Sequence, residues 1–115
     1  MKAKTVKEVL VAARWIIENV GWCKGEFAKS GDKSVWVGAY TTLEDAAKEA
    51  EVSTVDAFCS LGAINAVDAN HFLKEEAARI FHNSVGGSIS YWNDNEKRTK
   101  SQVLKAFDRA IAGAE

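Results

Sequence analysis

Eleven consecutive residues in the middle of the chain, Ala57 to Val67 (AFCSLGAINAV), constrain the fold most, because only Ser60 and Asn65 interrupt an otherwise apolar or small run. A helix that is apolar on all sides belongs in a protein core. We therefore expect a buried central helix from Ser53 to Val67. Its smallest residues recur at helical spacing, which lets a second helix pack closely against them. These residues are Cys59, Gly62, Ala63 and Ala66.

The N-terminal part of the chain predicts a helix that begins with a capping box at Thr5 to Glu8 and stops at Gly21. Trp15, within this helix, is expected to lie at least partly in the core. The sequence SGDK, residues 30–33, then lies between two short segments rich in Val, Phe, Trp and Tyr, which is typical of a β-hairpin. The apolar residues at helical spacing in the first helix are Val6, Val9, Leu10, Ala13, Ile16, Ile17 and Val20.

The segment between the hairpin and the central helix is expected to hold one short helix. Thr41 and Glu44 form a second capping box, which opens this helix, and the helix runs through about Glu51. The residues from Ser53 to Asp56 then supply the cap of the central helix.

Two helices and a strand are expected after the central helix. The first helix, His71 to Asn83, is amphipathic, and residues 89–92 (ISYW) have a strand-like composition. The last helix begins at a capping box of Thr99 and Gln102. In the helix from His71, the predicted buried face is Phe72, Leu73, Ala77, Ile80 and Phe81, and the predicted solvent-facing charges are Lys74, Glu75, Glu76 and Arg79.

Length and composition limit the class of protein. The chain has 115 residues, of which 47% are hydrophobic, which fits a single folded domain over residues 1–115 and excludes a disordered or membrane protein. The 15 basic and 16 acidic residues give a net charge of -1, so the chain has no field that attracts nucleic acid or a membrane. Glu8 and Arg14 interrupt the N-terminal apolar run, which is unlike a signal peptide and indicates a cytoplasmic protein. The composition suits a monomer or a homodimer.

These elements together predict an α+β domain. About five helices pack around the buried central helix, and a small antiparallel hairpin or three-strand sheet lies against one side. An all-α bundle with an irregular insert is the alternative.

Three segments, ARWIIENVGWCKG, AFCSLGAINA and YWNDNEKRTKSQVLKAFDRAI, combine a GW turn, an FCxxGA helix and WND followed by RT. In this combination the chain resembles a family of small uncharacterised domains of unknown function found in bacteria and bacteriophages. The resemblance implies a phage or prophage origin, and therefore the cytoplasm of a host cell, but it implies no activity. The spacer from Phe27 to Val55 has no feature that matches the family.

A polar cluster directly ahead of the last helix is the candidate ligand site. A guanidinium, an amide and free N–H groups at a helix start, all beside an indole, have the chemistry to hold an anionic, ring-bearing molecule. In the alternative interpretation the same residues only fix the entry to the helix, with Arg98 paired to Asp94. The candidate residues are Trp92, Asn93, Asp94, Arg98 and Thr99, with Trp22 as a further aromatic wall.

Catalytic and metal sites are not predicted. Cys59 with His71 or His82 has the residue types of a cysteine nucleophile, but a thiol on an apolar segment is disfavoured as a thiolate. Zinc binding by Cys23, Cys59 and the two histidines has the right ligand types but matches no paired spacing. No cofactor is expected.

The sequence therefore predicts a non-catalytic binding protein that sequesters an anionic, nucleotide-like small molecule. The alternative is a protein–protein interaction module that acts on a host partner, and a cysteine-dependent hydrolase is the third hypothesis. A cleft lined by Trp92 and Arg98 would favour the small ligand, whereas an exposed apolar patch would favour the protein partner.

Overall fold

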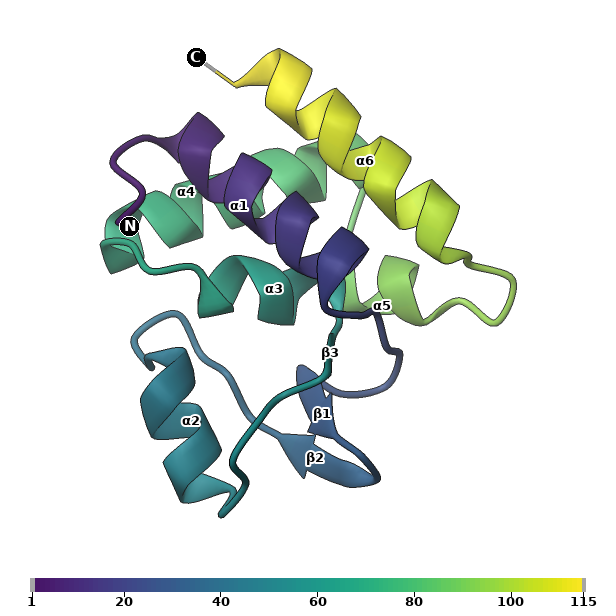
Figure 1. Cartoon of the computed structure of the whole chain (residues 1–115). Helices are drawn as coiled ribbons and strands as arrows, with labels where there is room; N and C mark the ends of the chain where they lie inside the picture. Colours follow the sequence, from purple (N-terminus) through teal and green to yellow (C-terminus); the bar gives the residue numbers. More distant parts are fainter. Residues whose placement is uncertain (1, 115) are drawn as a thin grey trace.

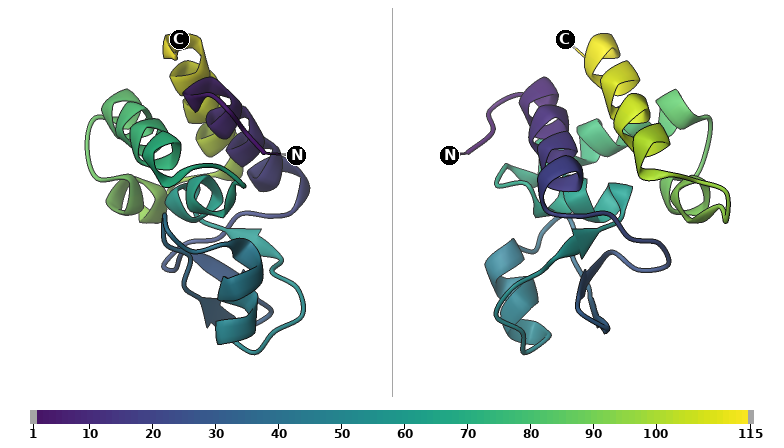
Figure 2. Two further views of the ribbon diagram at one scale, coloured as in Figure 1. Left: turned by 90° about the vertical axis from the view of Figure 1, so that its left-hand side faces the viewer. Right: turned by 45° about the vertical axis from the view of Figure 1, so that its right-hand side comes forward.

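Residues 2–114, the part of the chain that the computed structural model describes, form six helices and three short strands (Figure 1). The prediction of an α+β architecture with a small antiparallel sheet is confirmed. The longer helices gather at one end of the molecule, and the sheet and α2 form the other end (Figures 1 and 2). The elements are α1 (Val6–Asn19), β1 (Ala28–Ser30), β2 (Lys33–Val35), α2 (Leu43–Glu49), β3 (Ala57–Phe58), α3 (Ser60–Ala66), α4 (His71–Val85), α5 (Ile89–Asp94) and α6 (Lys100–Gly113).

Helix α1 packs against α3, α4 and α6. The Thr5 hydroxyl accepts a hydrogen bond from the Glu8 N–H (3.1 Å), so Thr5 is the N-cap as predicted. In the described part of the chain the reciprocal half of the predicted capping box is absent, because the Glu8 carboxylate accepts from the Lys4 N–H (2.8 Å) instead of the Thr5 N–H. No helix within residues 2–114 is long and apolar enough to cross a membrane. The face of α1 that lies in the core consists of Val9, Leu10, Ala13 and Ile17, all fully buried at helical spacing.

The predicted hairpin is confirmed and is part of a three-strand sheet in the order β2-β1-β3. Ser30 pairs with Lys33 at the tip, and Gly31 between them has a left-handed φ of 58°. On the other edge of β1, Ala28 lies opposite Phe58 of β3. Both of these side chains are buried, so this part of the sheet closes against the core.

Helix α2 is confirmed with shifted ends. Thr42 rather than Thr41 caps it, because the Thr42 hydroxyl accepts from the Asp45 N–H (3.0 Å). The helix ends at Glu49 instead of about Glu51.

The central helix is shorter than predicted. It begins at Ser60, and Ser53 to Asp56 does not cap it. The chain ahead of it is extended because its backbone hydrogen bonds go to other segments; for example, the Phe58 N–H donates to the Gly21 carbonyl (3.0 Å). A short apolar run suits a buried strand as well as a helix, so the pattern does not separate the two. Its central, buried position between α1, α4 and α5 is confirmed.

Gly62 on α3 is a point of close backbone approach, as the small residues predict, but the approaching segment is not a helix. A Cβ atom at Gly62 would lie 1.9 Å from the carbonyl oxygen of Phe27, immediately before β1. The small side chains of α3 therefore make room for the start of the sheet.

The strand predicted at residues 89–92 is wrong, because these residues belong to α5. The Ser88 hydroxyl accepts from the Tyr91 N–H (3.3 Å) and caps this helix. Ile89 and Asn93, one turn apart, are its buried residues. Burial of one helical face outweighs the strand propensity of ISYW here.

The predicted faces of α4 are wrong at its N-terminal end, where Phe72 is 68% exposed and Lys74 only 5%. The Lys74 ammonium donates to the carbonyl of Asn65 (2.7 Å). That carbonyl lies at the C-terminal end of α3, where backbone acceptors lack helical partners. The hydrocarbon stem of lysine allows this burial while the ammonium keeps a hydrogen bond.

Candidate functional site

Asn93, the centre of the predicted site, is fully buried on α5, and its amide joins separate segments of the chain. Its Oδ1 accepts from the Trp22 indole N–H (2.8 Å), the Ser60 N–H (2.9 Å) and the Ser60 hydroxyl (2.6 Å). Its Nδ2 donates to the Cys23 carbonyl (3.1 Å) and to the Asp94 carboxylate (3.0 Å). Both ends of the amide are therefore satisfied inside the protein. We call Trp22, Ser60, Asn93 and Asp94 the polar junction.

Two glycines allow the turn that carries Trp22 to reach the polar junction. The Gly25 N–H donates to the Asp94 carboxylate (2.9 Å), and Gly25 has a left-handed φ of 84°. Gly21 has a φ of 154°, and a Cβ atom there would lie 2.4 Å from the Asp56 carbonyl oxygen. The GW turn, the FC segment and the WND segment, distant in sequence, thus meet at one place.

Arg98 does not pair with Asp94, which corrects that part of the sequence interpretation. Its guanidinium carbon lies 4.0 Å from the centroid of the Trp92 ring, and its Nε donates to the Trp92 carbonyl (2.9 Å). Phe81 meets the same indole edge-to-face, with centroids 5.8 Å apart. Arg98 therefore holds Trp92 against the core through a cation–π contact and a charge-assisted hydrogen bond.

Thr99 has the capping role predicted for it. Its hydroxyl accepts from the Gln102 N–H (3.2 Å), and the Gln102 side chain accepts from the Thr99 N–H (3.1 Å). The reciprocal pair is a complete capping box. Geometry at Thr99, Arg98 and Asn93 thus supports the helix-entry interpretation.

The cavity that reaches this region is small and acidic. Its volume is about 160 Å³, whereas ligand pockets usually measure about 300 Å³ or more. Neither Trp92 nor Arg98 lines it, and two carboxylates, of Glu26 and Asp94, do. An anionic ligand at this cluster stays a prediction without geometric support.

Both cysteines are buried free thiols. The Cys59 Sγ accepts from the Gly62 N–H (3.2 Å) as the cap of α3. Burial raises the pKa of Cys59, and it raises the pKa of Cys23 to about 12. Within residues 2–114 no hydrogen bond joins either thiol to His71 or His82, and no three His, Cys, Asp or Glu side chains are grouped to hold a metal ion. Because burial keeps both thiols protonated, it disfavours the thiolate form that a cysteine nucleophile requires.

A second candidate surface, which the sequence interpretation missed, lies on α1. Trp15 is 59% exposed and Val11, one turn earlier, is 49% exposed, so the expectation that Trp15 lies at least partly in the core is corrected. Val11 and Trp15 are both outside the apolar stripe predicted for this helix, and they are four residues apart on one face. Their position outside the predicted stripe was the sequence signal for an exposed apolar face. We call Val11, Ala12 and Trp15 the α1 face.

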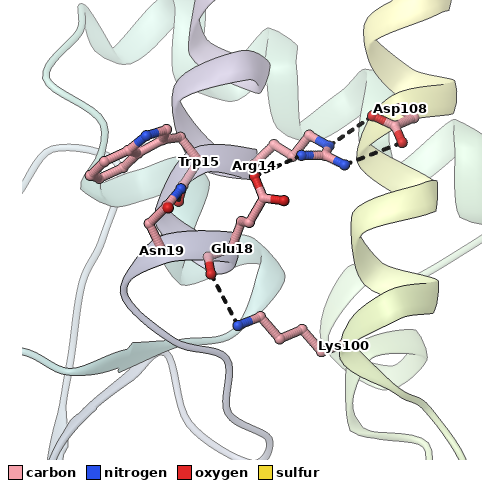
Figure 3. Close-up of polar contacts among 6 residues, drawn as sticks. All are labelled: Arg14, Trp15, Glu18, Asn19, Lys100 and Asp108. Carbon is pink, nitrogen blue, oxygen red and sulfur yellow. Dashed lines mark hydrogen bonds and ion pairs between the residues drawn. The ribbon is translucent and has the colours of Figure 1, made fainter.

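On the side of α1 that faces α6, polar contacts join the two helices (Figure 3). Arg14 forms an ion pair with Asp108 of α6 (2.7 Å) and another with Glu18 (3.1 Å). The Lys100 ammonium donates to the Glu18 carbonyl (3.2 Å). Trp15 projects to the opposite side, away from α6 (Figure 3). The α1 face is therefore separate from the contact between α1 and α6.

These features define a small α+β domain whose most distinctive polar residues hold its own segments together, with an apolar helix face left exposed. Among known families, the chain belongs to a family of unknown function, DUF6197, whose model matches residues 1–113. The resemblance to a family of unknown function is thereby confirmed, whereas the three motifs and the distribution in bacteria and bacteriophages stay predictions. No curated protein and no solved structure matches the chain. The phage or prophage origin stays a prediction.

Proposed function

We propose that this chain is a non-catalytic binding domain that recognises another protein through the α1 face. The exposure of Trp15 is the observation that carries this proposal, since 59% of a tryptophan lies open beside a half-exposed Val11. Tryptophan is enriched among the residues that dominate binding energy at protein interfaces. An exposed apolar surface of this kind is typical of an interaction site.

The shape around Trp15 suits a helical or extended segment of a partner. Two hollows, of about 500 and 510 Å³, lie beside it, and Ala12 and Trp15 line both. Ile16 and Val67 line the first hollow, and Val11 lines the second. Trp15 thus contributes to both hollows, so the side chains of one partner segment can contact the indole while they fill them.

Charged side chains of both signs line the two hollows. Lys2 lines the first hollow and Lys7 the second, both are exposed, and neither forms an ion pair within residues 2–114. Carboxylates line the same hollows: Glu8, which accepts from the Lys4 backbone N–H (2.8 Å), lines both, and Asp68 lines the first. We therefore assign the α1 face to an amphipathic partner segment whose apolar residues contact Trp15 and whose charged residues pair with these lysines and carboxylates.

The test compares Trp15→Ala with the wild type and with Tyr91→Ala, which removes an 82% exposed aromatic from α5. A partner captured on the wild-type protein is identified, purified and titrated by calorimetry. We expect Trp15→Ala to weaken binding by about tenfold or more and Tyr91→Ala to leave it unchanged. Binding should also weaken as salt is raised, because the lysine contacts are screened.

The variant must keep its fold for this comparison, and an exposed side chain predicts that it does. We expect the unfolding free energy of Trp15→Ala to stay within about 1 kcal/mol of the wild type. Equal partner affinity for Trp15→Ala and the wild type would overturn the proposal.

A further inference from the structure

A separate pocket is lined by residues of β2, of α2 and of the chain next to them. These elements form the end of the molecule at the bottom of Figure 1. The volume of the pocket is about 430 Å³, within the range of small-molecule sites. It belongs to the Phe27 to Val55 spacer, to which sequence reasoning assigned no role. Its lining residues are Ser34, Trp36, Thr41, Ala46, Glu49 and Ala50.

The indole of Trp36 forms a wall of this pocket. Neighbouring residues hold the ring in place, although the side chain remains exposed to solvent. Phe27 meets it edge-to-face, with centroids 6.3 Å apart at 78°. The ring also lies across Gly38, where a Cβ atom would come within 2.5 Å of it. Trp36 is nevertheless 65% exposed. This differs from Trp92, whose ring already carries Arg98 at 4.0 Å.

The polar groups in the pocket are unengaged, unlike those of the polar junction. Within residues 2–114 the Glu49 carboxylate forms no ion pair, whereas Glu44 on the same helix pairs with Lys48 (3.4 Å). The hydroxyls of Ser34 and Thr41 make no hydrogen bond in the same part of the chain. The surrounding segment, residues 28–57, carries six acidic side chains and three lysines. The local charge is therefore negative in a chain that is nearly neutral as a whole.

We infer that this pocket binds a small organic cation, an ammonium or guanidinium group attached to an apolar or aromatic portion. The cation lies against the face of Trp36 and pairs with Glu49, because an aromatic face and a carboxylate both attract positive charge. The apolar portion contacts Ala46 and Ala50, and the hydroxyls of Ser34 and Thr41 accept from the cationic N–H groups. This site is independent of the α1 face.

The test uses phenethylammonium chloride as the probe and 2-phenylethanol, which has the same ring without the charge, as its control. Calorimetric titration is done at fixed ionic strength. We expect phenethylammonium to bind with a dissociation constant of about 1 mM or lower, as suits a ligand of this size, and the neutral alcohol to bind at least about fivefold more weakly. No heat from phenethylammonium, or equal affinity for the alcohol, would overturn the inference.

Matched variants separate this pocket from the general acidity of the segment. Glu49→Gln removes the pocket carboxylate and should weaken phenethylammonium binding by about fivefold or more. Glu51→Gln removes an exposed carboxylate that does not line the pocket and should leave the affinity within about twofold. Trp36→Leu should abolish measurable binding. All three side chains are exposed, so the variants should melt near the wild type, and equal affinities for Glu49→Gln and Glu51→Gln would contradict the assignment.

Discussion

At the scale of single residues, the fully buried Asn93 is expected to have a large effect on stability. Asn93→Ala leaves the Ser60 N–H, the Cys23 carbonyl and the Trp22 indole N–H without their partner at a fully buried position. Each unsatisfied buried group costs about 1–3 kcal/mol, so we expect the free energy of unfolding to fall by about 3 kcal/mol or more. Chemical denaturation measures this change.

Asn83→Ala is the control for the Asn93 variant. Asn83 is exposed on α4, and its side chain makes no hydrogen bond within residues 2–114. We expect its free energy of unfolding to change by no more than about 0.5 kcal/mol. If the two alanine variants were equally stable, the polar junction would not be an important source of stability.

Arg98 distinguishes a structural role of the WND and RT cluster from a ligand role. Because its guanidinium packs on Trp92 and bonds the Trp92 carbonyl, Arg98→Ala should lower the free energy of unfolding by about 1–2 kcal/mol. Arg98→Lys should recover only part of the loss, since lysine lacks the planar group. Thermal unfolding of both variants gives the comparison.

The same measurement, repeated with nucleotides and dinucleotides, tests the anionic ligand predicted from the sequence. With the polar groups of Asn93 and Asp94 already bonded internally, we expect no nucleotide to raise the melting temperature of the wild type. A nucleotide-dependent rise that Arg98→Ala abolished would restore the ligand hypothesis for this cluster.

At the scale of secondary-structure elements, the contact of α3 with the start of β1 depends on Gly62. In Gly62→Ala the new Cβ would lie 1.9 Å from the Phe27 carbonyl oxygen, and because that atom is backbone, the segment must move. We expect a loss of about 2 kcal/mol or more in the free energy of unfolding.

Gly113→Ala is the matched control, because nothing lies within 4 Å of a Cβ atom there and the residue ends α6. Alanine favours helix over glycine, so this variant should be as stable as the wild type or more stable by up to about 1 kcal/mol. A Gly62→Ala protein with an unchanged melting temperature would show that α3 and β1 are not in close contact.

Local signals in the sequence predict some elements well and others poorly. The caps at Thr5 and Thr99 and the turn at Gly31 depend on residues a few positions apart, and all three are found in the structure. The extended chain at Phe58 depends on partners such as Gly21, far away in sequence, which a local pattern cannot contain. The same holds for the buried Lys74, whose acceptor lies on another helix.

At the scale of the whole molecule, the sequence identified residues that lie close together in space, but it did not show whether their contact binds a ligand or stabilises the fold. Trp22, Asn93 and Asp94 converge as the candidate site required, yet they bond one another and the backbone. Composition does not distinguish the exposed Trp15 and Trp36 from aromatic residues of the core. The exposure of an aromatic side chain depends on how the helices and strands pack against one another.

The polar junction also limits when native hydrogen bonds can form during synthesis of the chain. Asn93 accepts hydrogen bonds from Trp22, 71 residues earlier, and from Ser60, 33 residues earlier. Closing loops of this length loses chain entropy before any contact compensates for it. A ribosome builds from the N-terminus, so the Trp22 indole and the Ser60 N–H have no native acceptor until residue 93 has been added and has left the exit tunnel. The segments that carry Trp22 and Ser60 therefore lack these native hydrogen bonds until the Asn93 amide is available.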